Sequence, residues 1–92
     1  MSEPFDELRA RIVANDRAIV ELVNARLRLV EELWRLKAER RLPQLDPERE
    51  QALLDALDRT NAGPLSPAGL RGLVTELLTL TKRELGDSSG NR

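Results

Sequence analysis

The stretch from Phe5 to Arg41 contains neither glycine nor proline, and this constrains the fold more than any other feature of the sequence. Apolar residues recur through it at helical spacing, which predicts one uninterrupted helix. At about 1.5 Å of rise per residue that helix is roughly 55 Å long, whereas a compact chain of this size has a radius of gyration of about 12 Å. The helix therefore overhangs its own domain. The apolar positions are Leu8, Ile12, Ile19, Leu22, Leu29, Leu33 and Leu36.

An overhanging amphipathic helix exposes an apolar stripe unless another surface covers it. A chain of 92 residues also buries only a modest fraction of its surface when it is alone. A two-fold dimer is the commonest way to cover such a stripe. We therefore predict an intertwined helical homodimer.

Two further helices are predicted from their start signals. Pro43 ends the first helix. Asp46-Pro47 and Ser66-Pro67 then each place an N-cap residue before a proline at the first helical position. We expect the second helix to run to about Thr60, because residues 61–64 form a stop signal.

The third helix is expected to reach about Leu85. No alternating strand pattern is present, so the predicted fold class is all-α, with a long, a short and a medium helix. Residues 1–85 then form one helical domain, and residues 86–92 are expected to form a flexible tail.

The composition excludes several classes of function. The chain has 15 basic and 16 acidic residues with no basic tail, which argues against nucleic acid and anionic membranes as partners. It has no cysteine or histidine, so disulfides, thiolate nucleophiles, imidazole bases and most zinc chemistry are excluded. No run is long and apolar enough to span a membrane, and the N-terminus does not resemble a signal peptide. We expect a cytoplasmic protein.

Four charged residues interrupt the apolar face of the long helix, namely Arg9, Asp16, Arg26 and Lys37. They could be boundary residues whose long stems reach water. However, charges near a core are costly unless each finds a partner. Because cations outnumber carboxylates on this face, an anion from outside the chain would balance it.

The spacing of these residues limits how they can meet. Arg26 and Lys37 lie about three turns apart, roughly 16 Å along the helix axis, and on nearly the same face. They could line one pocket if the segment 45–50 (LDPERE) closes over it, and Glu50 falls on the apolar stripe of that segment's helix. Arg9 lies about 42 Å from Lys37, so it could enter only the site of a partner in an antiparallel dimer.

This inventory favours chemistry in which several fixed cations hold a small dianion and no nucleophile or histidine takes part. Arginine binds a carboxylate through two parallel hydrogen bonds, and lysine can be aimed at a single oxygen. Catalysis would then rest on orientation and electrostatic preorganisation. Glu50 suits the acceptor for a substrate hydroxyl.

Taken together, these residues resemble the all-helical (type II) class of chorismate mutase, over Phe5 to about Leu85. The segments LPQLDPERE (42–50) and NAGPLSP (61–67) look most like the versions linked to the first enzyme of the shikimate pathway. The charged positions that carry the resemblance are Arg9, Asp16, Arg26, Lys37, Asp46, Arg49 and Glu50.

The resemblance implies a homodimer with two shared sites and the Claisen rearrangement of chorismate to prephenate, in phenylalanine and tyrosine biosynthesis, with no metal and no cofactor. Arg26 and the Arg9 of the second chain would hold the two substrate carboxylates, and Lys37 would donate to the ether oxygen. Glu50, with Asp46 and Arg49 around it, would hold the ring hydroxyl.

On the third helix the family's small polar residue falls on Thr81, which we expect to line the site. One turn later, where the family has a glutamine or glutamate, this chain has Leu85, which cannot donate a hydrogen bond. Glu84 could serve if the helix end were rotated.

Other hypotheses about the function stay open at this point. One is a non-catalytic dimer that regulates an enzyme of the shikimate pathway, and docking to such an enzyme is also possible for a mutase. Another keeps the fold but changes the reaction, to isochorismate lysis or to rearrangement of the amino analogue of chorismate. Inward placement of Arg26, Lys37 and Glu50 together favours the mutase.

Overall fold

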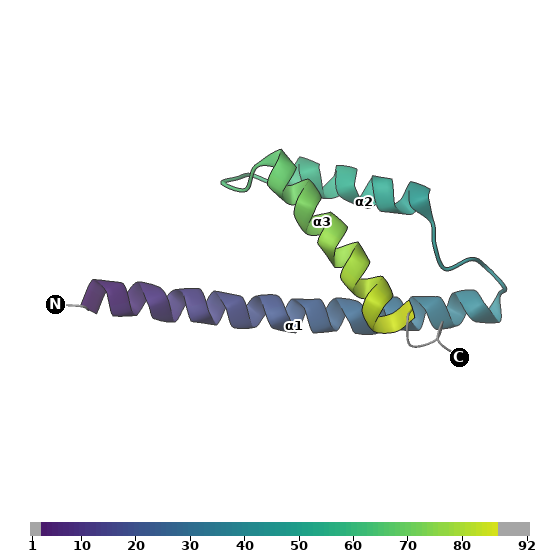
Figure 1. Cartoon of the computed structure of the whole chain (residues 1–92), viewed down its shortest axis with the longest axis horizontal. Coiled ribbons are helices and arrows are strands. Elements are labelled where there is room, and N and C mark those ends of the chain that lie inside the picture. The colour runs from purple at the N-terminus through teal and green to yellow at the C-terminus, as the bar shows by residue number, and fades with distance from the viewer. Residues whose placement is uncertain (1–2, 87–92) are drawn as a thin grey trace. The chain divides into compact units, whose positions relative to one another are not determined.

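The computed structural model describes residues 3–86. They form helix α1 (Glu3–Glu39), helix α2 (Pro47–Thr60), helix α3 (Pro67–Thr81) and a π-helix (Lys82–Gly86) that continues α3 (Figure 1). No strand occurs in this part of the chain. The predicted all-α class and the order long, short, medium are confirmed.

The chain divides into two compact units, residues 1–32 and 33–92. The described part of the first unit is α1 up to Glu32. The second unit holds the last turns of α1 together with α2, α3 and the π-helix. Apart from Gly86, the last residue of the π-helix, the predicted tail 86–92 lies outside the described residues.

The α1 helix starts two residues earlier than predicted. Pro4 is tolerated because the first turn of a helix has no backbone donors to lose. Glu3 and Asp6 also lie in this turn, where negative charge favours the helix N-terminus. No residue of α1 is buried, and Leu22 and Leu29 are 69% and 67% exposed. The apolar stripe of this helix is therefore uncovered in the single chain.

The end of α1 is a Schellman motif. Arg41 has a left-handed φ of 57°, its N–H donates to the Ala38 carbonyl (3.1 Å), and the Leu42 N–H donates to the Lys37 carbonyl (2.8 Å). The helix consequently ends at Glu39, before the predicted boundary at Arg41. Arginine occupies a position that usually takes glycine.

Helices α2 and α3 begin as their sequence signals predict. The Asp46 carboxylate accepts from the Arg49 N–H at 3.3 Å, and the Ser66 hydroxyl accepts from the Gly69 N–H at 2.9 Å. Each cap satisfies one of the backbone donors left unpaired at a helix start. Pro47 follows the first cap directly.

The turn between α2 and α3 is organised by Asn61. Its side-chain Nδ2 donates to the Leu65 carbonyl (2.8 Å), and its Oδ1 accepts from the Gly63 N–H (3.0 Å). Gly63 has φ 85°, which a residue with a Cβ rarely adopts. Gly63 thus serves the turn itself, while the extended Asn61 is the C-cap residue of α2.

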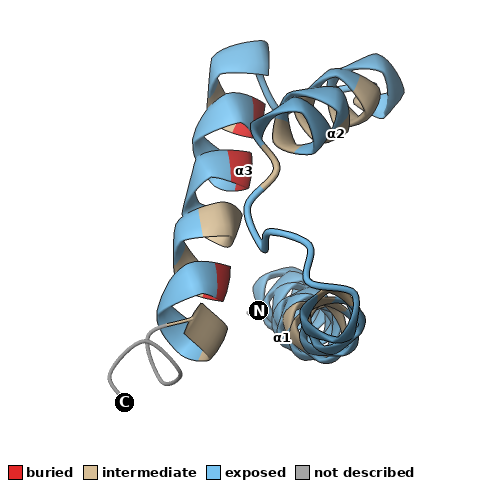
Figure 2. Ribbon diagram, turned by 90° about the vertical axis from the view of Figure 1, so that its right-hand side faces the viewer, coloured by how far each residue is buried: buried red, intermediate tan, exposed pale blue. Residues whose placement is uncertain are grey.

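Burial in the second unit is concentrated where α3 packs against α2 (Figure 2). Leu70 and Val74 are buried on α3, and Leu53, Leu54 and Leu57 of α2 are half-buried. This core is small for the 60 residues of the unit. No helix among the described residues is long and apolar enough to cross a membrane.

Candidate active site

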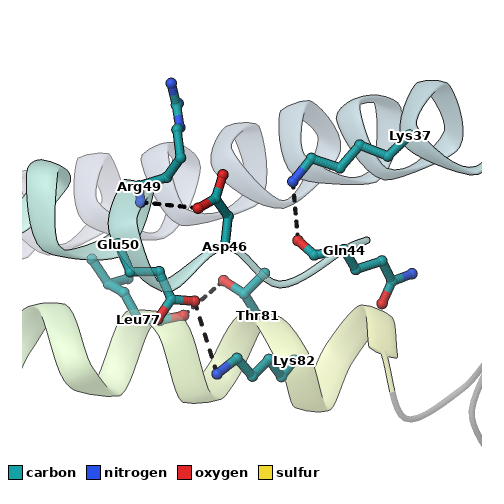
Figure 3. A network of polar contacts seen from close by, with 8 residues as sticks. All are labelled: Lys37, Gln44, Asp46, Arg49, Glu50, Leu77, Thr81 and Lys82. Atoms are coloured by element: carbon teal, nitrogen blue, oxygen red, sulfur yellow. Dashed lines mark hydrogen bonds and ion pairs between the residues drawn. The ribbon is translucent and has the colours of Figure 1, made fainter. Parts of the chain in front are cut away.

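A polar cluster in the second unit gathers residues from three helices (Figure 3). Lys37 comes from the end of α1, Glu50 from the first turns of α2, and Thr81 and Lys82 from the junction of α3 with the π-helix. We call these four residues the polar cluster. Its members are separated by up to 45 positions in the sequence, so only the fold can bring them together.

Lys37 is half-buried, and its ammonium donates to the backbone carbonyl of Gln44 at 3.0 Å. The same residue accepts at its own carbonyl from Leu42 in the turn that ends α1. Both its backbone and its side chain are therefore fixed by the connection to α2. A lysine ammonium has three donors, so two remain for another acceptor.

Asp46 and Arg49 have local roles at the start of α2. Asp46 caps the helix through the Arg49 N–H, which occupies one of its carboxylate oxygens. The Arg49 side chain is exposed, and Figure 3 shows its guanidinium directed away from the Glu50 carboxylate. A role for either residue in binding stays a prediction.

Glu50 is half-buried, and its carboxylate meets the ammonium of Lys82, with 3.9 Å between Oε2 and Nζ (Figure 3). The Glu50 N–H makes the first helical bond of α2, to the Asp46 carbonyl at 3.0 Å. The two side chains are 34% and 47% exposed, so water screens the pair and its contribution to stability is below about 1 kcal/mol. A carboxylate can accept about four hydrogen bonds, which leaves Glu50 capacity for a ligand.

Thr81 is the one buried polar residue among those described, with 5% of its surface exposed. Its hydroxyl donates to the Leu77 carbonyl at 2.7 Å, one helical turn back. This bond satisfies the donor that burial would otherwise leave unpaired. A threonine hydroxyl is both a donor and an acceptor.

The π-helix decides which residue after Thr81 faces the protein. Its wider turn leaves Glu84 exposed, whereas Leu85 and Gly86 are half-buried. The rotation that would bring Glu84 inward is therefore not observed. Gly86 lies against Trp34, since a Cβ added to Gly86 would be 3.8 Å from the Trp34 Cζ3 atom.

The remaining predicted residues lie on the part of α1 that belongs to the first unit. Arg26 is half-buried, and Asp16 and Arg9 are exposed. The Arg9 guanidinium lies over the Phe5 ring, 5.9 Å from its centroid, a cation–π contact worth about 0.5–1 kcal/mol at an exposed site. The structure thus places Lys37, Glu50 and Thr81 on three helices of the second unit, and it carries Arg9 and Arg26 on the helix that also carries Lys37.

Sequence reasoning missed two members of this arrangement. The contact of Lys37 with the Gln44 backbone carbonyl could not be predicted from residue types, because every residue has a backbone carbonyl. Lys82 follows Thr81 directly, and neighbouring positions on a helix point about 100° apart, so it does not fall on the predicted face. Its long stem nevertheless lets the ammonium reach Glu50.

Comparison with known proteins gives a consistent result. A family model described as chorismate mutase type II matches residues 8–84. The chain is similar to a chorismate mutase from Thermus thermophilus, solved in two forms, with 35% identity and a TM-score of 0.83 to each. The similarity covers 86% of this chain and 99% and 90% of the two solved chains. No curated protein sequence matches at a significant level.

Proposed function

The chain belongs to the chorismate mutase type II family, and we propose on that basis that it catalyses the rearrangement of chorismate to prephenate. The observation that carries the proposal is the 35% identity to a solved chorismate mutase, together with the placement of Lys37, Glu50 and Thr81 on three helices of the second unit. The resemblance to the family assigns these three positions to one side of the site.

The reaction is intramolecular. The ether C–O bond of chorismate breaks while a C–C bond forms within the same molecule, so no proton, electron or second substrate enters or leaves. The protein has to hold a flexible dianion in the compact reactive conformation and stabilise the negative charge that develops on the ether oxygen. Both tasks are orientation and electrostatics, and neither needs the cysteine or histidine that the chain lacks.

Lys37 is the residue we assign to the ether oxygen. One of its three donors is held by the Gln44 carbonyl, which fixes the direction of the ammonium. The other two can reach an acceptor without first reorganising the side chain. A fixed donor aimed at an oxygen where charge develops typically contributes about 10²–10³-fold to the rate constant.

Glu50 is the residue we assign to the ring hydroxyl. It is half-buried on the same cluster as Lys37, and an ionised carboxylate is an acceptor only, which suits a hydroxyl donor. Thr81 and the side chains of Asp46 and Arg49 would complete this side of the site.

Arg26 and Arg9 are assigned to the two carboxylates of the substrate, with Arg9 supplied by a second copy of the chain. Two observations support a dimer. The apolar stripe of α1 is uncovered in one chain, with Leu22 and Leu29 among its most exposed members. The chain is also small and has a small core of its own. An intertwined pair of α1 helices would bury that stripe and bring an arginine from each chain to the other's site.

Mixing two inactive variants tests the shared site. Arg9→Ala and Arg26→Ala each remove one residue from every site of a homodimer. A mixed dimer would regain one intact site out of two, so random mixing should restore about a quarter of wild-type activity. A folded mixture that stays inactive would contradict the transfer of Arg9 between chains. Light scattering that shows a folded monomer at micromolar concentration would contradict the dimer itself.

The activity is tested by the loss of chorismate absorbance with the product identified. Wild-type protein should form prephenate, and Arg26→Ala should lose at least about 10²-fold in kcat/KM, because a bidentate contact with a substrate carboxylate is removed. Arg28→Ala is the matched control, since this exposed arginine lies two residues further along α1. Absence of turnover in the wild type would overturn the proposed activity.

A shikimate-pathway enzyme as a second partner and a cytoplasmic location stay predictions. Co-elution of the chain with the first enzyme of that pathway would establish the former.

A further inference from the structure

We assign the Glu50 carboxylate to the ring substituent of the substrate, and this carboxylate already forms an ion pair in the protein without substrate. The Lys82 ammonium lies 3.9 Å from its Oε2 atom. In Figure 3 the ammonium of Lys37 is turned to Gln44 and the guanidinium of Arg49 points away, so among the residues drawn it is Lys82 that reaches Glu50.

We propose that Lys82 is a specificity-determining residue, which makes the site select a neutral hydroxyl over an ammonium group at the ring position that Glu50 contacts. This inference rests on the proposed function, and it names the feature that separates chorismate from its amino analogue. Without such a cation a carboxylate would favour the analogue, because an ammonium adds the attraction between opposite charges to the hydrogen bond that a hydroxyl also makes.

The selection works through repulsion. The amino analogue carries a primary alkyl amine, which is protonated at neutral pH. Its ammonium would share the Glu50 carboxylate with that of Lys82. Repulsion between two like charges about 6 Å apart corresponds to roughly 3-fold in rate in bulk water and roughly 100-fold near a protein surface. Lys82 is 47% exposed, so screening places the expected effect near the middle of this range, at about tenfold. A hydroxyl meets no such repulsion and can use the remaining acceptor sites of Glu50.

The structure gives little support to a purely structural role for Lys82. It lies at the first position of the π-helix, and an exposed ion pair at 3.9 Å stabilises the fold by little. Removal of its charge should therefore leave the fold intact and change the interaction with the substrate.

The test compares kcat/KM for chorismate and for 4-amino-4-deoxychorismate, in the full-length protein at neutral pH. The variants are Lys82→Met, which removes the charge, Lys82→Arg, which keeps it, and Lys82→Glu, which reverses it. Arg83→Met is the matched control, since this exposed neighbour loses the same charge without the contact to Glu50. Where the analogue is not turned over, its inhibition constant against chorismate replaces kcat/KM.

The preference for the amino analogue relative to chorismate should rise about tenfold in Lys82→Met and further in Lys82→Glu. It should stay within about twofold of wild type in Lys82→Arg and Arg83→Met. An unchanged ratio in Lys82→Met and Lys82→Glu would overturn the inference, and so would an equal change in Arg83→Met. The two failures are distinguishable, because wild-type protein that does not convert chorismate overturns the proposed function, whereas normal conversion with an unchanged ratio overturns only the role of Lys82.

Discussion

Replacement of Lys37 by methionine tests the catalytic assignment most directly. Methionine keeps most of the length of the side chain and removes the ammonium. The structure gives that ammonium one fixed contact, to the Gln44 carbonyl at 3.0 Å, and leaves two donors for the ether oxygen. If those donors act where charge develops, Lys37→Met should lower kcat by about 10²–10³-fold, which corresponds to about 2.7–4 kcal/mol.

The same replacement has a smaller and separable effect on stability. The contact with Gln44 is at an exposed position, so its loss should cost about 1 kcal/mol in the free energy of unfolding. For a chain of this size that lowers Tm by about 4–8 °C at fixed protein concentration. Circular dichroism at the assay temperature then shows whether the variant is folded when its activity is measured.

Two controls isolate the ammonium. Gln44→Ala retains the backbone carbonyl that accepts from Lys37, so its kcat should stay within about twofold of wild type. Because the interaction with the ether oxygen strengthens in the transition state, Lys37→Met should lower kcat and kcat/KM by similar factors. A folded Lys37→Met protein with kcat within about fivefold of wild type would refute the assignment. A fall in activity as large in Gln44→Ala would show that the loop conformation, and not the ammonium, is what matters.

Substitutions at three further positions test the same structure. Arg41→Gly should raise the free energy of unfolding, measured by urea denaturation, by about 0.5–1 kcal/mol. Glycine removes the steric cost of a Cβ in the left-handed conformation, and this gain exceeds the extra entropy that glycine gives the unfolded chain. A destabilised variant would contradict this account of the turn. Asp46→Ala should lose about 1 kcal/mol through its cap while Asp46→Asn loses little, and equal losses in the two would show that capping is not the cause. Leu85→Gln should raise kcat severalfold, since the half-buried side chain would gain a donor one turn after Thr81, and an unchanged kcat would place position 85 outside the site.

The helices were predictable because their boundary signals act over three or four residues. Asp46-Pro47 and Ser66-Pro67 fix a cap and a first helical residue within one turn, and the structure shows both caps. The end of α1 was less predictable. A Schellman motif depends on one residue in a left-handed conformation, and an arginine at position 41 does not predict that conformation as a glycine would.

Candidate site residues could be predicted from the sequence only where the helical spacing of apolar neighbours shows which face of the helix they lie on. Lys37 and Glu50 could be placed on faces because apolar neighbours define those faces. The contact of Lys82 with Glu50 could not, because it depends on the approach of α3 to α2 and on the reach of a flexible stem. The fate of Glu84 also required the structure, since no local signal predicts that a π-helix follows Thr81.

The charges of the second unit bear on how the proposed site would hold a dianion. The charged residues that Figure 3 draws are three cations, Lys37, Arg49 and Lys82, and two carboxylates, those of Asp46 and Glu50, an excess of one positive charge. In the site that we propose, Arg26 and an Arg9 from a second chain would raise that excess enough to match a substrate with two carboxylates. If Arg9 is available only in the dimer, as we propose, substrate binding and association are one linked equilibrium. Chorismate should then stabilise the dimer by mass action, in proportion to the logarithm of its concentration. One long helix thus carries both the exposed apolar stripe that a dimer would cover and the two arginines that we assign to the substrate carboxylates.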